Sequence, residues 1–237
     1  MRPKKTSALV AIVLSVIFGI SYLHPDLLPD PRPSRFDSVV LITSIGCKSS
    51  STQTVGTVIG DGLVLTVAHG VAGQLSNTVT TTSGETLKAK IAAIDTEMDL
   101  AVLKISADPM SELNFTPLKF AQAVAGSNAY FVAFKDSSQF VQPARIKRTL
   151  LINTQDIYLE TNVTRPGIEV ETKVVVGNSG GPLINDKDEI VGIIWSTSRN
   201  VKNRSWATRI EAANVLLSRV STSNPTSQSP QVVACSG

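Results

Sequence analysis

From Ser38 onward, short runs of β-branched and other apolar residues alternate with turn signals. Such runs predict β-strands, and the pairs Asp61-Gly62 and Ser83-Gly84 predict tight turns between them. Two groups of about six runs are separated by a less periodic segment, 107–126. The expected strands are 39–45, 55–59, 63–68, 79–82, 87–94 and 100–105, followed by 129–134, 140–146, 157–161, 170–175, 183–184 and 190–196. This pattern predicts an all-β fold of two packed six-stranded antiparallel β-barrels.

Composition narrows the possible functions. The chain has 237 residues, which is enough to bury a substantial core, and its 42% hydrophobic content excludes a disordered chain. The net charge is only +3, and no basic run with interleaved aromatic residues occurs, so we expect no nucleic-acid partner. The sequence contains no metal-type spacing and no cofactor fingerprint, so we expect neither a metal nor a cofactor.

A glycine-rich string at 177–182, Gly-Asn-Ser-Gly-Gly-Pro, lies between two apolar runs. Glycines on both sides of Ser179 permit a tight turn that presents its hydroxyl and leaves the amides of Gly177 and Ser179 unpaired. Acyl transfer needs a nucleophile of this kind beside donors placed where negative charge develops. A plain glycine-rich hairpin turn is the alternative interpretation.

A serine nucleophile needs a base, and the chain has two histidines. His24 lies in a proline-rich segment, where we expect no fixed geometry, whereas His69 follows the apolar run 63–68. Asp99, at the start of the run 100–105, is the candidate acid that orients the imidazole, and Asp95 is the alternative. Taken alone, His69 also fits a core histidine, and Asp99 a solvated residue at a strand end.

Three strings carry a family resemblance: Thr-Val-Ala-His at 66–69, Met-Asp-Leu-Ala-Val-Leu at 98–103, and 177–182. Their His, Asp, Ser order resembles that of the chymotrypsin-fold serine proteases, and most closely the HtrA/DegP-like branch. The resemblance covers roughly residues 38–220 and implies a serine endopeptidase that acts on protein or peptide substrates. It implies Ser179 as nucleophile, His69 as general base and acid, Asp99 as the orienting acid, and the Gly177 and Ser179 amides as the oxyanion hole.

The resemblance also implies a substrate pocket next to Ser179. Its expected lining residues are Lys173, Val174, Trp195, Ser196, Thr197 and Ala207. The family favours aliphatic side chains before the scissile bond, which the apolar run 174–176 fits, whereas Lys173 fits an acidic preference. Asn178 stands where digestive relatives have an Asp that pairs with a new N-terminus, so we expect no activation by such a cleavage.

The first 23 residues form a separate unit. Arg2, Lys4 and Lys5 precede the apolar run 8–23, which predicts an N-terminal hydrophobic helix that anchors the protease domain outside the cytoplasm. A cleaved secretory signal, which would release the domain, is the alternative. Residues 24–37 are rich in proline and predict an extended linker to the protease domain at 38–220.

The C-terminal part contains one expected helix and a tail. The string 208–211, Thr-Arg-Ile-Glu, predicts a capping box, and Ile210, Ala213, Leu217 and Val220 then share one face. Residues 221–237 are rich in Ser, Thr, Asn, Gln and Pro and predict a flexible tail. The HtrA-like family usually carries a PDZ domain after the protease domain, and this sequence leads us to expect none.

The two cysteines, Cys47 and Cys235, can pair in an oxidising compartment and pin the tail to the first barrel, or remain as a buried thiol and a stray one. Two functional alternatives also remain at this point. A protease-like domain that binds peptides without cutting them, or an esterase, would have the same three strings.

Overall fold

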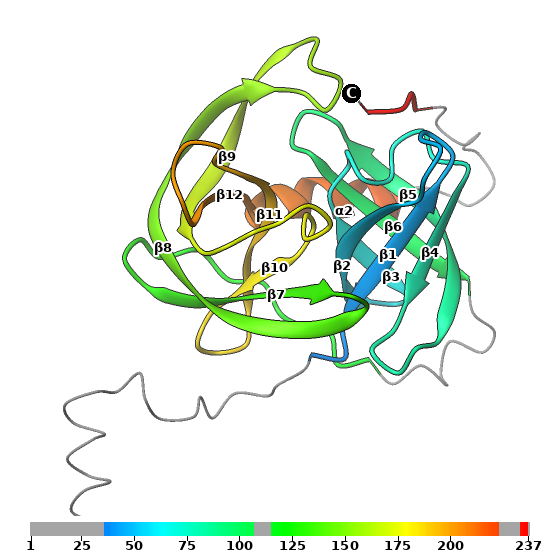
Figure 1. Ribbon diagram of the computed structural model, residues 1–237, viewed down its shortest axis with the longest axis horizontal. Coiled ribbons are helices and arrows are strands. Elements are labelled where there is room, and N and C mark those ends of the chain that lie inside the picture. The colour runs from blue at the N-terminus through cyan, green and yellow to red at the C-terminus, as the bar shows by residue number, and fades with distance from the viewer. Residues whose placement is uncertain (1–35, 107–114, 223–232, 237) are drawn as a thin grey trace, which may run out of the picture. The chain divides into compact units, whose positions relative to one another are not determined.

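The computed structural model describes residues 36–106, 115–222 and 233–236 (Figure 1). The expected hydrophobic helix at 1–23, nearly all of the linker at 24–37 and most of the tail at 221–237 lie outside the described residues. Within the described ranges, no helix has the length and apolar character needed to cross a membrane.

The first six strands form an antiparallel sheet that closes into a barrel in the order β1-β2-β3-β6-β5-β4, because β4 pairs back with β1. The predicted turn between β2 and β3 has positive φ at both Asp61 and Gly62, as a tight hairpin requires. The strands of this first barrel are β1 (Val39–Ile45), β2 (Thr52–Gly60), β3 (Leu63–Thr66), β4 (Ser76–Thr80), β5 (Thr86–Asp95) and β6 (Leu100–Ser106).

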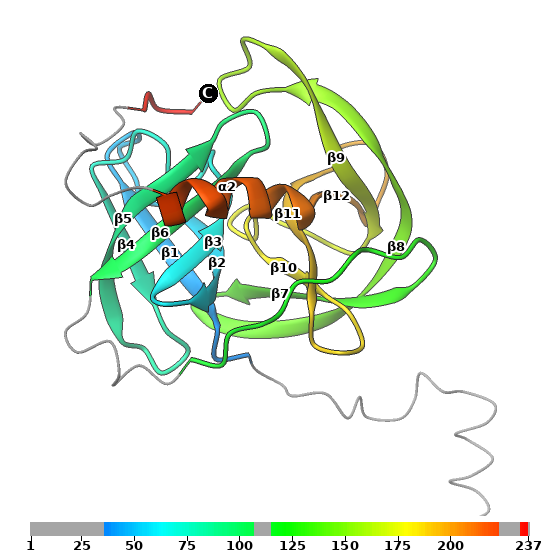
Figure 2. The same cartoon turned by 180° about the vertical axis from the view of Figure 1, so that it is seen from behind.

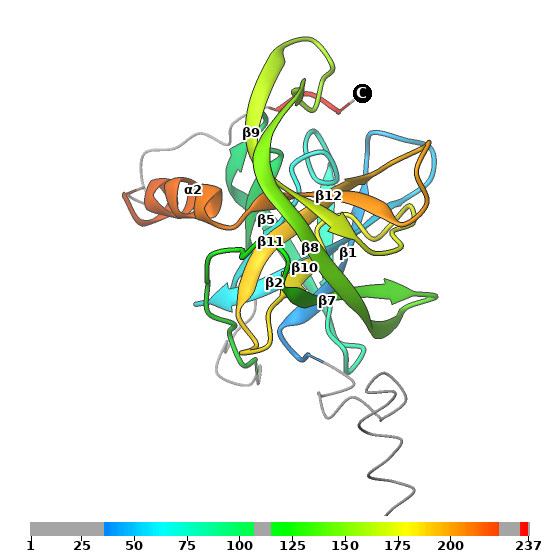
Figure 3. The same cartoon turned by 90° about the vertical axis from the view of Figure 1, so that its left-hand side faces the viewer.

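The other six strands form the second barrel, in the order β10-β11-β12-β9-β8-β7, and the pairing of β10 with β7 closes it. Its strands are β7 (Asn128–Lys135), β8 (Ser138–Gln155), β9 (Asn162–Glu171), β10 (Pro182–Ile184), β11 (Ile190–Thr197) and β12 (Arg204–Arg209). Figure 1 shows the two barrels side by side, and Figure 3 shows the long β8 curving along the second barrel. The sequence-based prediction of two six-stranded antiparallel sheets is therefore confirmed.

Helix α2 (Glu211–Thr222) follows β12 and crosses the back of both barrels (Figure 2). One cluster of buried apolar side chains joins these three parts of the fold. It contains Leu65, Val67, Leu100 and Val102 of the first barrel, Ile190 and Ile193 of the second, and Ile210, Ala213 and Leu216 at the helix. Because burial of each large aliphatic side chain contributes about 1.5–3 kcal/mol, this shared core holds the barrels and the helix together.

The helix differs from its prediction at its start and on its buried face. Thr208 belongs to β12 and its hydroxyl donates to the Met98 carbonyl oxygen at 3.1 Å, so the predicted capping box at 208–211 is wrong. Leu216 is fully buried, whereas Leu217, which the periodicity favoured, is only partly buried. The helix begins at Glu211, two residues later than a cap at Thr208 implies, and Leu216 is its most deeply buried leucine.

The predicted strand at 157–161 is also wrong, because this segment is the loop between β8 and β9. The Asp156 carboxylate accepts hydrogen bonds from the amides of Tyr158 and Glu160 at 3.1 and 3.0 Å, and Leu159 has a φ of 62°. The apolar character of Ile157 has another cause, since its buried side chain packs in the core of the first barrel. The hairpin thus reaches from the second barrel to the first.

Candidate active site

His69 lies on the loop that follows β3, three residues after the strand ends at Thr66. Val67 and Ala68 are fully buried, and the Ala68 carbonyl oxygen accepts hydrogen bonds from two amides further along the loop. These contacts anchor the backbone on both sides of the histidine. The His69 side chain remains 31% exposed, so its imidazole is accessible.

Asp99 lies in the turn between β5 and β6 and is buried against His69. Its Oδ2 lies 2.8 Å from His69 Nδ1, and its Oδ1 accepts the His69 backbone amide at 2.9 Å. The alternative acid, Asp95, accepts the Met98 amide at 2.9 Å and lies 3.6 Å from the Arg219 guanidinium. In the structure, the imidazole of His69 is therefore hydrogen-bonded to Asp99 and not to Asp95.

The pKa of His69 is raised above its ordinary value. Burial alone lowers this pKa, but the negative charge of Asp99 and its hydrogen bond to the ring outweigh that effect. The positive charges of Arg165 and Lys48 lower the pKa and oppose part of the rise. Hydrogen bonding of Nδ1–H to Asp99 leaves Nε2 of the neutral ring as a proton acceptor.

Ser179 lies in a tight turn between β9 and β10. Gly177 has a φ of 93°, a left-handed conformation that favours glycine, and the Asn178 amide donates to the Val175 carbonyl oxygen at 3.0 Å. The Asn178 side chain is buried and donates to the Phe134 carbonyl oxygen at 2.9 Å. Asn178 thus holds the turn through neutral hydrogen bonds. The ion pair with a new N-terminus that digestive relatives form would need an aspartate at this position.

The Ser179 hydroxyl donates to the Trp195 carbonyl oxygen at 3.5 Å. Across the described residues, it makes no hydrogen bond with His69, so two of the three predicted catalytic groups are in direct contact and the third is turned away. The amides of Gly177 and Ser179 donate to no acceptor in the described part of the chain. They are therefore available to an oxygen atom from outside the protein.

The Ser179 turn is attached to the first barrel by its backbone. The Val55 amide on β2 donates to the Ser179 carbonyl oxygen at 2.8 Å, and the Thr66 hydroxyl on β3 donates to the Val55 carbonyl oxygen at 2.7 Å. Since His69 follows β3 directly, these bonds bring the serine turn of the second barrel to the histidine loop of the first.

The six predicted pocket residues do not share one environment. Lys173 and Thr197 are exposed, and Trp195 and Ser196 are half-buried. Val174 and Ala207 belong to the hydrophobic core of the second barrel. Beside them, Val176 is fully exposed next to Gly177.

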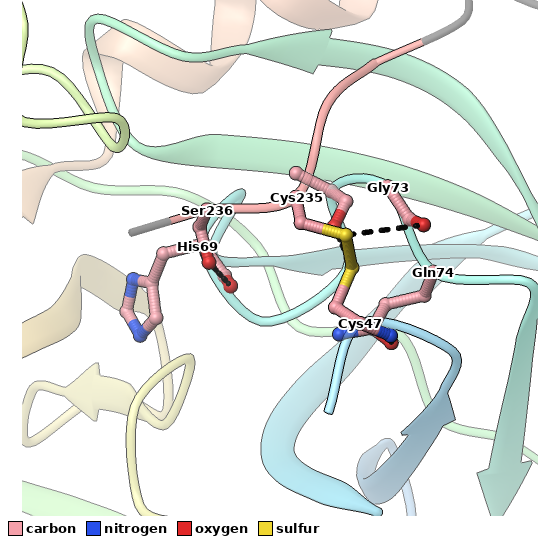
Figure 4. Close-up of a disulfide and its surroundings, with 7 residues drawn as sticks. Cys47, His69, Gly73, Gln74, Cys235 and Ser236 are labelled. Carbon is pink, nitrogen blue, oxygen red and sulfur yellow. Dashed lines mark hydrogen bonds between the residues drawn. A yellow bond between two sulfur atoms is a disulfide. The ribbon is translucent and has the colours of Figure 1, made fainter. Parts of the chain in front are cut away.

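The predicted disulfide is confirmed, since Cys47 and Cys235 are bonded across 188 positions of sequence. Figure 4 shows that this bond places Ser236 beside His69, and the Ser236 hydroxyl donates to the His69 carbonyl oxygen at 2.8 Å. The Cys47 amide also donates to Gln74 Oε1 at 3.0 Å. The bond therefore pins residues 233–236 onto the loop that carries the histidine.

The local sequence pattern did not point to one buried charge at this site, Arg165 on β9. Its side chain is 2% exposed, and Nη1 lies 3.8 Å from Asp99 Oδ2. The predicted strand began at Val170, five residues too late to include it. Arg165 lies two residues after Val163 and shares its inward face, so an arginine at an inward position of a longer predicted strand would have been the signal.

Comparison with known proteins identifies the family. The profile of the trypsin-like peptidase domain matches residues 54–193. The chain belongs to the trypsin-like peptidases. Its curated relatives include serine proteases named DegP-like or HtrA. Among the described residues, no group of three or more His, Cys, Asp or Glu side chains is arranged to hold a metal ion.

Two curated relatives of this trypsin-like peptidase are informative. "Probable periplasmic serine endoprotease DegP-like" from Halomonas elongata is 34% identical over 159 residues, covering 65% of this chain and 31% of the relative. "Serine protease Rv3671c" from Mycobacterium tuberculosis is 31% identical over 189 residues, covering 77% and 46%. The chain thus spans less than half of the length of each of these relatives, 31% of one and 46% of the other.

Solved structures agree with the fold. The active form of the Rv3671c protease from M. tuberculosis has a TM-score of 0.74 and 26% identity, covering 85% of this chain and 86% of that one. The inactive form of the same protease has a TM-score of 0.66 and 27% identity, covering 78% and 89%. The peptidase described above is therefore similar to both forms.

Proposed function

We propose that this serine protease is an endopeptidase that cleaves extracytoplasmic proteins through Ser179, His69 and Asp99. The observation that carries the proposal is the His69–Asp99 pair, in which Nδ1 and Oδ2 are 2.8 Å apart. A carboxylate in this position selects the imidazole tautomer whose Nε2 can accept the serine proton, and it stabilises the imidazolium that then forms.

The reaction starts with a rotation of the Ser179 side chain. Its hydroxyl leaves the Trp195 carbonyl oxygen and donates to His69 Nε2, a change about a single staggered torsion. As the hydroxyl oxygen attacks a peptide carbonyl, His69 takes its proton, and the amides of Gly177 and Ser179 bind the oxyanion. His69 then protonates the leaving amine, and water, deprotonated by the same imidazole, hydrolyses the acyl-enzyme.

An extracytoplasmic location is supported by two observations. The Cys47–Cys235 disulfide is of a kind that persists in oxidising compartments. Two relatives, from Halomonas elongata and Hahella chejuensis, carry names that describe them as periplasmic. We propose that residues 1–23 anchor the domain at 38–220 to a membrane through the linker at 24–37, with secretion after signal cleavage as the alternative.

The proposed substrates are proteins or peptides, bound beside Ser179 along Trp195, Ser196 and Thr197. These three residues end β11, whose backbone is next to the serine turn. The fully exposed Val176 favours an aliphatic neighbour to the scissile bond, whereas the exposed Lys173 would favour an acidic one. Profiling with a peptide library decides between these two preferences.

A fluorophosphonate probe tests the proposal, because it reacts covalently only with an activated serine. We expect the purified protein to be labelled, and both Ser179→Ala and His69→Ala to abolish labelling while their circular dichroism stays unchanged. Absence of labelling in the folded wild type, with peptide binding retained, would instead establish a non-catalytic peptide-binding domain. An esterase would be labelled as well but would fail to cleave the peptide library.

A further inference from the structure

Arg165 is a buried arginine that joins the second barrel to the turn carrying Asp99. It lies on β9, and its Nε donates to the Glu97 carbonyl oxygen at 2.5 Å. Its Nη2 donates to the Gln155 carbonyl oxygen, at the end of β8, at 2.9 Å. These bonds orient a planar guanidinium from two sides, so Arg165 occupies one fixed position between the barrels.

The same guanidinium lies beside Asp99, the partner of His69, and beside Trp195, the partner of Ser179. Its Nη1 lies 3.8 Å from the Asp99 carboxylate, and its central carbon lies 4.8 Å from the ring centre of Trp195. The Trp195 carbonyl oxygen in turn accepts the Ser179 hydroxyl. Since the buried indole N–H of Trp195 has no partner among the described residues, packing and the cation–π contact hold this ring.

We infer that Arg165 is a positioning residue that aligns the Asp99–His69 pair of the first barrel with the Ser179 turn of the second. This inference rests on the function proposed above. Arg165 attracts the Asp99 carboxylate through its charge and holds Trp195 through its planar face. The contacts run from His69 through Asp99, Arg165 and Trp195 to Ser179, so one side chain fixes both halves of the site.

The charges around the pair determine what loss of Arg165 does to the pH dependence. Asp99 faces His69 and raises the pKa of the imidazole, whereas Arg165 on β9 and Lys48 before β2 lower it. Removal of the Arg165 charge therefore raises the pKa of His69 further. The neutral, base-competent imidazole then forms only at higher pH.

Arg165 is itself surrounded by acids. Burial lowers its pKa, and Asp99, Asp156 and Asp95 raise it. A neutral residue at this position leaves these three carboxylates without their shared cation. Asp99 has 3% of its surface exposed, and among the described residues His69 is then its one remaining charged partner, which strengthens the rise in the pKa of His69.

The test is the pH profile of fluorophosphonate labelling and of peptide hydrolysis by the full chain. In Arg165→Met, we expect kcat/KM at neutral pH to fall about 10- to 100-fold through misplacement of the pair, and the acid limb to move to higher pH. In Arg165→Lys, the charge stays and the planar fork is lost, so the acid limb stays in place while kcat falls.

Arg204→Met is the matched control. The Arg204 guanidinium lies 2.8 Å from Glu169 and 4.9 Å from the centre of the Trp206 ring, so it makes the same kinds of contact away from the three proposed catalytic residues. We expect this variant to keep the wild-type pH profile. Urea unfolding followed by circular dichroism compares the stability of all variants.

The outcomes separate the inference from the proposed function. If the wild type is not labelled, the proposed function fails. Suppose that the wild type is labelled and that Arg165→Met is folded. If the acid limb of this variant then stays at the wild-type pH, the inference is overturned, even when the rate of the variant falls. Should Arg165→Met not fold, Arg165→Gln, which keeps donors for Glu97 and Gln155 without the charge, takes its place; an acid limb unchanged in that variant overturns the inference equally.

Discussion

At the scale of single residues, the site depends on a backbone conformation that few side chains adopt. Asp99 has a φ of 54°, in the left-handed region, which aspartate tolerates better than most residues. The bonds from Asp99 to the His69 amide and imidazole offset the cost of this conformation. The residue proposed to orient the imidazole is therefore also the one that holds the β5–β6 turn in shape.

The His69–Asp99 pair predicts the direction of the pH dependence. Asp99 raises the pKa of His69 above 6.5. As the pH falls, we therefore expect activity to be lost at a higher pH than it would be with an ordinary histidine as the base. Asp99→Asn should move this acid limb to lower pH and reduce kcat roughly 10³- to 10⁴-fold. The measurement is kcat/KM against pH for a peptide substrate.

Asp95→Asn is the control for this prediction. Asp95 is the last residue of β5, directly before the same turn, and its carboxylate accepts the Met98 amide and does not contact His69. The acid limb should remain where it is in the wild type. A large shift in this variant, with none in Asp99→Asn, would reverse the assignment of the two acids.

At the scale of elements, the loop after β3 is held by a segment from the other end of the chain. The disulfide to Cys235 and the Ser236 hydroxyl both contact this loop, where His69 lies. A crosslink that closes a long stretch of chain stabilises the fold mainly by restricting the unfolded chain. The bond therefore affects both the stability of the domain and the loop that carries the proposed base.

Replacement of both cysteines, Cys47→Ser with Cys235→Ser, should lower the free energy of unfolding by about 2–4 kcal/mol. Urea titration with and without dithiothreitol measures the effect. The reductant should destabilise the wild type to a similar degree and leave the double variant unchanged. Equal midpoints for the oxidised and reduced wild type would contradict a stabilising role.

At the scale of the whole molecule, function depends on how closely the two barrels approach at Ser179. Gly180 has a φ of 87°, and a Cβ there would overlap the Val55 carbonyl oxygen on β2. The same oxygen accepts the Thr66 hydroxyl, at the end of the strand that leads to His69. A side chain at position 180 would thus push the serine turn away from the first barrel.

We expect Gly180→Ala to lose about 1–2 kcal/mol of stability from backbone strain and roughly 1–3 kcal/mol more from the overlap. Fluorophosphonate labelling should fall sharply at the same time. Urea unfolding and the labelling rate are the two measurements.

Gly126→Ala isolates the strain. Gly126 has a φ of 83°, close to that of Gly180, but a Cβ there meets nothing within 4 Å. This variant should lose only the strain energy and label at the wild-type rate. Equal losses in both variants would mean that the barrels do not need this close approach.

Most of the fold follows from local patterns. Strand β1 matches its prediction at both ends, and the ten strands from β2 to β11 each overlap a predicted run. Alternation of side chains and the conformations that turns require are properties of neighbouring residues, so they can be recognised without a structure. The strings around His69, Asp99 and Ser179 are likewise short, and their order along the chain identified the family.

Tertiary contacts decided the rest. Thr208 resembles a helix cap but bonds to Met98, and Ile157 resembles a strand residue but fills the core of the other barrel. The local pattern can place Arg165 on a buried face but cannot give its role, because that role comes from Asp99 and Trp195, which lie far from it in sequence. The amino-acid sequence by itself thus determined the strands, the family and the candidate reactive groups. The tertiary structure alone decided that the Arg165 charge lies beside Asp99 and that the Ser179 hydroxyl turns toward Trp195, because only the folded chain brings these neighbours together.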